Sequence, residues 1–125
     1  MKIDAHCHLF SPGLADAVAQ NTEYRIRLDR EKRIMTTFLG LNVPLSTEEE
    51  RVTEMEEMAI DTQIVSVRTG ALFGPDGLSA SLESRSLLAK TINEYLATIC
   101  ERYSRRFMAY ADIPLDPANP QVATK

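Results

Sequence analysis

Three residues near the start of the chain have the types and the spacing of a metal site. The first ten residues read MKIDAHCHLF, so Asp4, His6 and His8 follow one another at intervals of two. Side chains alternate between the two faces of a β-strand, and this spacing therefore predicts all three on one face. Two imidazoles about 6 to 7 Å apart along a strand can converge on one metal ion. We predict His6 and His8 as metal ligands and Asp4 as a group that orients one of them.

A simpler interpretation of this pattern is a pair of exposed or hydrogen-bonded histidines at the end of a strand. His6 and His8 are the only histidines in the chain, which makes their spacing more informative. Two imidazoles and a carboxylate buried together would be unfavourable unless they were paired or ligated. Both interpretations place Ile3, Ala5 and Cys7 on the opposite face of the strand.

The segment after this strand predicts a small insertion. Ser11-Pro12-Gly13 should interrupt regular structure, and residues 14–20 suit a short helix. Residues 23–38 predict a β-hairpin with its charged turn at residues 29–32, and a single helix over the same residues is the alternative. We interpret residues from about 20–45 as a small β insertion that lies over the site.

Beyond the insertion, helices and strands are expected to alternate. Ser46 and Glu49 have the spacing of a capping box for a helix that runs to about Ala59. The glycines of residues 69–79 lack the spacing of a phosphate-binding loop, which favours a mobile loop. The remaining expected elements are a strand at residues 63–67, a helix at 81–103, a strand at 107–113 and a helix that begins at Asp116 and Pro117.

Composition and charge exclude several classes of partner. The net charge of -4 gives no basic surface for nucleic acid or an anionic membrane. No stretch has the apolar core of a signal peptide or the roughly 20 apolar residues of a membrane span. Cys7 and Cys100 suit buried free thiols, and a disulfide between them is the alternative. We therefore expect a cytoplasmic protein that binds neither nucleic acid nor membrane.

Three segments resemble, in the right order, the amidohydrolase superfamily and its branch that includes aminocarboxymuconate-semialdehyde decarboxylase. IDAHCHLF looks like the first barrel strand, EEERVTEMEEMAIDTQIVSV is similar to the first helix and second strand, and NEYLATICERYSRRFMAYADIPLDPANP resembles the next helix and third strand. The resemblance implies an α/β fold, the first three strand-helix units of a (β/α)8 TIM-type barrel, and one divalent metal, usually zinc, with His6 and His8 as paired ligands. A whole barrel takes about 250 residues. Residues 1–125 are thus expected to be the N-terminal part of a metal-dependent hydrolase barrel domain.

The resemblance implies an enzyme, a carboxy-lyase (decarboxylase) or a hydrolase, that acts on a small carboxylic acid through a metal-activated water. In the family, the further metal ligands and the general base come from later strands, which this sequence lacks. We therefore assign no catalytic residue and expect the 125-residue chain alone to be inactive. The alternative is a non-catalytic α/β module that binds or self-associates. An unpaired apolar third strand invites pairing with another chain, so this chain, if it folds alone, is expected to be a homo-oligomer.

The resemblance also bears on the substrate. In the semialdehyde decarboxylase, an arginine just before a proline at the end of the insertion holds a substrate carboxylate. The matching stretch here, Gly40-Leu41-Asn42-Val43-Pro44, has no arginine, so the substrate stays open. The arginines that could replace it are Arg25, Arg27, Arg30 and Arg68, although each also suits an ordinary surface charge.

Overall fold

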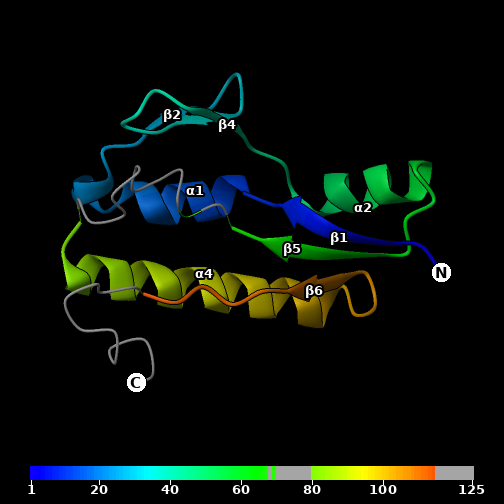
Figure 1. Cartoon of the computed structure of the whole chain (residues 1–125). Coiled ribbons are helices and arrows are strands. Elements are labelled where there is room, and N and C mark those ends of the chain that lie inside the picture. Colours follow the sequence, from blue (N-terminus) through cyan, green and yellow to red (C-terminus); the bar gives the residue numbers. More distant parts are fainter. Residues whose placement is uncertain (68, 70–79, 115–125) are drawn as a thin grey trace.

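The computed structural model describes residues 1–67, 69 and 80–114, and these form two small sheets with helices packed on them (Figure 1). The elements, in chain order, are β1 (Ile3–His8), α1 (Pro12–Ala19), the 3-10 helix η1 (Thr22–Tyr24), β2 (Arg27–Asp29), β3 (Ile34–Thr36), β4 (Asn42–Pro44), α2 (Glu48–Glu57), β5 (Thr62–Ser66), α4 (Leu82–Arg102) and β6 (Phe107–Ala109). The expected loop at residues 69–79, apart from its first residue, and the expected helix start at Asp116 lie outside the described residues.

The sheet that carries the candidate site has the strand order β1-β5-β6, and both pairings are parallel. Parallel neighbours need a crossover connection, and α2 and α4 are the helices that precede β5 and β6 along the chain. The prediction of an α/β fold with a parallel sheet is confirmed. Since β5 lies between the other two strands, it holds the sheet together.

Helix α2 begins one residue later than predicted. Thr47, and not Ser46, is the N-cap of α2, and its hydroxyl accepts from the backbone N–H of Glu50 at 3.2 Å. Glu50 completes the capping box by accepting from the backbone N–H of Thr47 at 2.9 Å. The backbone N–H of Ser46, which a capping box at that residue would use, donates instead to the carbonyl of Phe10 at 3.1 Å. The helix also ends earlier than predicted, since Ala59 has a φ of 53°, outside the helical region.

The first helix also differs from its prediction. Ser11 and Pro12 begin α1 and do not interrupt it, because Pro12 lacks the N–H that a first-turn residue would leave unpaired. The Ser11 hydroxyl accepts from the backbone N–H of Leu14 at 3.1 Å and caps the helix. Helix α1 lies between the small antiparallel sheet and α4, and it contacts both (Figure 1).

The antiparallel sheet has the order β2-β3-β4. The predicted hairpin is confirmed by the pairing of β2 with β3, which rules out the single helix over residues 23–38. The third strand, β4, was not predicted, because three residues that end in Pro44 carry too short an alternation to indicate a strand. Gly40 makes the return possible, since its φ of 78° is a conformation that favours glycine.

Polar contacts attach the antiparallel sheet and the residues that precede its strands to the helices. The Arg33 guanidinium forms two hydrogen bonds to the Glu50 carboxylate, at 2.5 and 2.6 Å, and they lower the pKa of Glu50 to about 2. At the other end, Glu23 accepts from the backbone N–H of Ser81 at 2.6 Å and from the Ser84 hydroxyl at 2.8 Å. The antiparallel sheet and the residues beside it are therefore fixed at the N-terminal ends of both α2 and α4.

The core lies between the sheet and α4. The apolar stripe of α4 is fully or almost fully buried together with Val65 of β5 and Phe107 of β6. The helix was predicted at residues 81–103 and is found within one residue of those limits. Among the described residues, no helix combines the length and the apolar character that a membrane crossing needs.

The last strand is shorter than predicted. It ends at Ala109, although the backbone N–H of Tyr110 still donates to the Val65 carbonyl at 3.0 Å. Asp112 then leaves the sheet, because its backbone N–H donates to the Asn93 side chain of α4 at 2.7 Å. A side chain of the helix thus replaces the strand partner that the sequence pattern suggested.

Replacing Ile92 with alanine tests this core. Ile92 is 0% exposed, so the truncation should leave a cavity and lower the free energy of unfolding by about 2 to 5 kcal/mol. Leu87 lies on the same helix and is 58% exposed, so Leu87→Ala should change it by less than about 0.5 kcal/mol. Urea unfolding followed by circular dichroism measures both. Equal losses in the two variants would contradict the assigned core.

Candidate functional site

The two histidines lie together at the C-terminal end of β1. Their ring centroids are 5.1 Å apart, with an angle of 83° between the ring planes. Both side chains are exposed on the face of the sheet that α4 does not cover. The two rings therefore lie side by side, and their binding of a metal stays a prediction.

A bulge in β1 changes which residues share that face. Asp4 pairs with Gln63 and Cys7 pairs with Val65, so two residues of β1, Ala5 and His6, stand against one residue of β5. Such an extra residue reverses the alternation of side chains along the strand. Gln63 and Val65 lie on the same, buried face of β5, so Asp4 and Cys7 share that face.

The prediction that Asp4 shares a face with the histidines is therefore wrong. The two oxygens of its carboxylate accept from the backbone N–H of His6 at 3.3 Å and from the Gln63 side chain at 3.1 Å. Ile3, expected on the opposite face, instead lies on the face of His8, because it pairs with Thr62 and His8 pairs with Ser66. The contact of Asp4 with the site thus runs through the backbone of the bulge.

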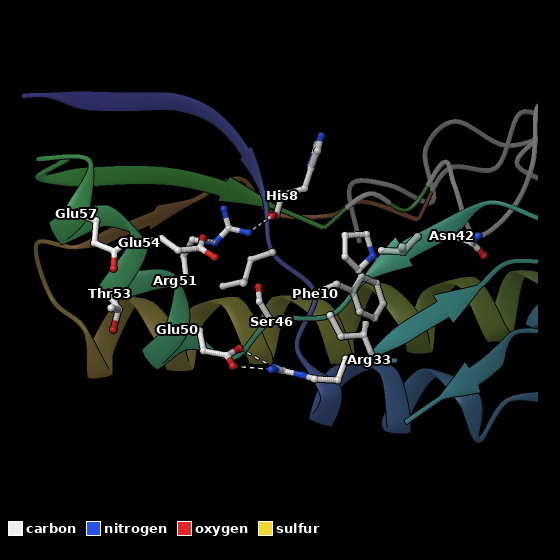
Figure 2. Close-up of a pocket in the computed structure, with 14 residues that line it drawn as sticks. His8, Phe10, Arg33, Asn42, Ser46, Glu50, Arg51, Thr53, Glu54 and Glu57 are labelled. Atoms are coloured by element: carbon white, nitrogen blue, oxygen red, sulfur yellow. Dashed lines mark hydrogen bonds and ion pairs between the residues drawn. The ribbon is translucent and has the colours of Figure 1, made fainter. Parts of the chain in front are cut away.

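His8 is held by contacts to two neighbouring elements. Its Nδ1 lies 3.0 Å from the hydroxyl oxygen of Ser66 on β5. Its backbone carbonyl accepts from a guanidinium nitrogen of Arg51 on α2 at 3.3 Å, and Figure 2 shows the ring turned away from that arginine. The backbone N–H of Leu9 donates to the Ser66 carbonyl at 3.2 Å and extends the pairing of the strands past His8.

The histidine pair fits a divalent metal of the predicted kind. Tetrahedral zinc with Zn–N bonds of about 2.0 to 2.1 Å holds two imidazole centroids about 5 Å apart. The separation of 5.1 Å between the rings of His6 and His8 agrees with this requirement. The contact of Nδ1 of His8 with Ser66 leaves its other ring nitrogen, Nε2, for a ligand.

The remaining ligands of such a site do not come from the described part of this chain. Within residues 1–67, 69 and 80–114, no group of three or more His, Cys, Asp or Glu side chains is placed to hold a metal ion. Catalytic zinc usually has three protein ligands and one open position. His6 and His8 alone therefore supply fewer protein ligands than a catalytic zinc ion usually has.

A cavity of about 690 Å³ lies beside the end of β1, on the side of Arg51 (Figure 2). It is lined by residues 8–10, by β4 and the turn after it, and by one side of α2. Two arginines line it, Arg33 and Arg51, and sequence reasoning had named neither. Arg33 precedes β3, and Arg51 lies on α2 beside the end of β1. No local sequence pattern indicates that these two positions meet at one cavity.

The arginines proposed from the sequence lie elsewhere. Arg25, Arg27 and Arg30 are exposed, and none of them lines this cavity. Arg30 forms an ion pair with Asp16 of α1 at 2.7 Å. Arg68 lies outside the described residues.

The structure was compared with known proteins. It matches a crystal structure of 4-oxalomesaconate hydratase from Rhodopseudomonas palustris with a TM-score of 0.64 and 15% identity, over 99% of this chain and 37% of that one. It matches a crystal structure of an amidohydrolase II with a TM-score of 0.65 and 15% identity, over 100% of this chain and 37% of that one. No protein-family model and no curated protein sequence matches the chain.

These matches confirm the resemblance to amidohydrolase-family enzymes at the level of the fold. The chain spans a little over a third of the length of each matched structure, so the likeness concerns a partial domain. The strands β1, β5 and β6 and the helices between them are the part of the chain that carries the parallel sheet.

The reactivity of Cys7 tests the face assignment. Cys7 and Cys100 are both free and half-buried, and burial, followed by the nearby Asp4 carboxylate, raises the pKa of Cys7 from 9.0 to about 11. At pH 8 the thiolate fraction of Cys7 in the folded chain should therefore be about a hundredfold smaller than that of an ordinary cysteine, since their pKa values differ by about two. In a Cys100→Ser variant, alkylation of Cys7 at pH 8 should be slower by about that factor than in the urea-unfolded chain, and it should accelerate up to about pH 11. Equal rates in the folded and unfolded chains would place Cys7 on the exposed face.

Proposed function

We propose that this chain supplies part of the metal centre of a metal-dependent enzyme of amidohydrolase type, which acts on a small carboxylic acid. The observation that carries the proposal is the pair of exposed imidazoles, His6 and His8, with ring centroids 5.1 Å apart at the C-terminal end of a strand. Active sites of barrel enzymes lie at this end of the parallel strands. The ion we propose is zinc, because two imidazole nitrogens suit it.

The chain's own residues position the ligands. β5 holds β1 at both sides of the bulge, through Gln63 at Asp4 and through Ser66 at His8. Arg51 fixes the backbone at the end of the strand by its bond to the His8 carbonyl. A divalent ion held there would activate a water molecule and polarise a carboxylate or carbonyl group of the substrate. The exposed face leaves room on the side of the rings for a substrate and for ligands from another part of the protein.

The substrate class and the wider fold rest on the likeness to known structures. By its name, 4-oxalomesaconate hydratase acts on a small carboxylic acid. The match to it covers 99% of the present chain and 37% of the hydratase. We propose that β1, β5 and β6 are the first three strands of a (β/α)8 barrel and that the antiparallel sheet is its insertion. Later strands of the same protein, or a partner, would complete the metal centre. Reaction types that fit are the release of carbon dioxide and hydrolysis.

Metal content is the direct test of this proposal. Purified chain, dialysed and then loaded with one equivalent of zinc, should retain metal near one ion per chain, and His6→Ala and His8→Ala should each lose most of it. The chain has no other histidine, so neither variant can be rescued by a neighbouring ring. Elemental analysis after gel filtration measures the retained metal. An Arg30→Ala variant serves as the control, since Arg30 is exposed and pairs with Asp16 away from the site. No retained metal in the parent chain would contradict a site built on these histidines in this chain.

A second candidate function is self-association without catalysis. Both β1 and β6 have one unpaired edge in the described sheet, and an unpaired edge favours pairing with another chain. The exposed face also carries Ile3 and Met108, which are 47% and 56% exposed. These side chains share a face with His8. Ile3, Met108 and His8 pair with Thr62, Ile64 and Ser66 in turn, and these three residues lie on one face of β5.

Sedimentation equilibrium tests this second function. Parent protein should then sediment as a dimer or larger species, and Met108→Lys should shift it toward the monomer, because a charge on the buried face of an interface would be desolvated. Leu87→Lys is the matched control, since Leu87 is equally apolar and 58% exposed but lies on the helix layer. A monomeric parent at about 100 μM, or equal effects of the two lysines, would contradict association through this face.

A further inference from the structure

One hydroxyl group, that of Ser66, lies beside the candidate ligand His8. Ser66 is the last residue of β5 and stands directly opposite His8 in the parallel pairing. Its hydroxyl oxygen is 3.0 Å from Nδ1 of His8. The contact is therefore fixed by the pairing of the two backbones and not by the reach of a long flexible side chain.

The contact determines which ring nitrogen can meet a metal. A neutral imidazole has one N–H and one lone pair, and its two nitrogens exchange these roles between tautomers. Nδ1 is directed at Ser66 and is therefore not available to an ion on the exposed face. Nε2 is the nitrogen left for the ion, and it carries a lone pair only when Nδ1 carries the proton. The serine oxygen is then the acceptor for that proton.

We propose that Ser66 is a positioning residue of the metal centre, which holds His8 as the Nδ1–H tautomer so that Nε2 faces the ion. The inference rests on the proposed function and adds to it the residue that sets the tautomer. Groups that accept from the outer nitrogen of a histidine ligand fix its orientation and make the ring a better ligand. A hydroxyl in this place does so without adding a charge next to the ion.

The sequence carries a signal for this role. In the run Thr62-Gln63-Ile64-Val65-Ser66, polar residues lie on both sides of the apolar pair Ile64 and Val65. Gln63 is bonded to Asp4 before the bulge, and Ser66 is in contact with His8 after it. β5 thus contacts β1 on both sides of the bulge.

The test compares Ser66→Ala with Ser66→Thr, which keeps the hydroxyl. Zinc affinity, measured by competition with a chromogenic chelator, should fall about 10- to 100-fold in Ser66→Ala and stay within about threefold of the parent in Ser66→Thr. Ser104→Ala removes a hydroxyl from an exposed turn residue and should leave the affinity unchanged. Equal affinity of the parent and Ser66→Ala would overturn the inference. Melting temperatures of all variants show whether each one is folded.

A second readout needs no metal. Two-bond proton–nitrogen correlation spectra of the metal-free protein at pH 8 report the tautomer of each histidine. The parent should show His8 with its proton on Nδ1, and Ser66→Ala should move that proton to Nε2, the tautomer that free histidine prefers. A parent with the proton on Nε2 would overturn the inference. If the parent binds no zinc, the proposed function fails, and these spectra alone decide whether Ser66 sets the tautomer.

Discussion

The pairing of β1 with β5 is the interaction on which the rest of this structure depends. It fixes the face that each side chain of β1 occupies, it brings Ser66 to His8, and it leaves Ala5 and His6 together against one residue of the partner strand. β5 in turn is fixed by the core, because Val65 is fully buried together with side chains of α4. The position of the candidate ligands therefore follows from the packing of a strand that carries neither of them.

Polar contacts explain how the small antiparallel sheet holds a defined place on this fold. Two side chains of this region are buried in the core: Met35 of β3 is 0% exposed, and Tyr24 of η1 is 2% exposed. The Tyr24 hydroxyl donates to the Ser84 carbonyl, and Glu23 accepts from Ser81 and Ser84 at the start of α4. Carboxylates at the first turn of a helix are favoured by its dipole. At the start of α2 the carboxylate is the helix's own Glu50, and the contact from outside the helix is made by the Arg33 guanidinium.

The sequence predicted the histidine pair and the parallel sheet, and it failed where a local choice depends on a distant partner. His6 and His8 share a face in any strand without a bulge between them, so their prediction was safe. Asp4 was misplaced because the bulge is set by the pairing with Gln63, which no pattern within β1 reveals. The capping box was predicted one residue too early because Ser46 and Thr47 are both favoured at N-caps. The backbone N–H of Ser46 donates to Phe10, whereas that of Thr47 donates to the Glu50 side chain.

The bulge has a consequence for how related chains are aligned. Ala5 and His6 together occupy one step of the ladder, so a chain that lacked Ala5 could pair with β5 regularly and still place Asp4 opposite Gln63 and His8 opposite Ser66. Every side chain would keep its face. Two homologues that differ in length by one residue at this point can therefore build the same site. An alignment that forbids a gap inside a strand would then match the acidic residue of one chain to the wrong position of the other.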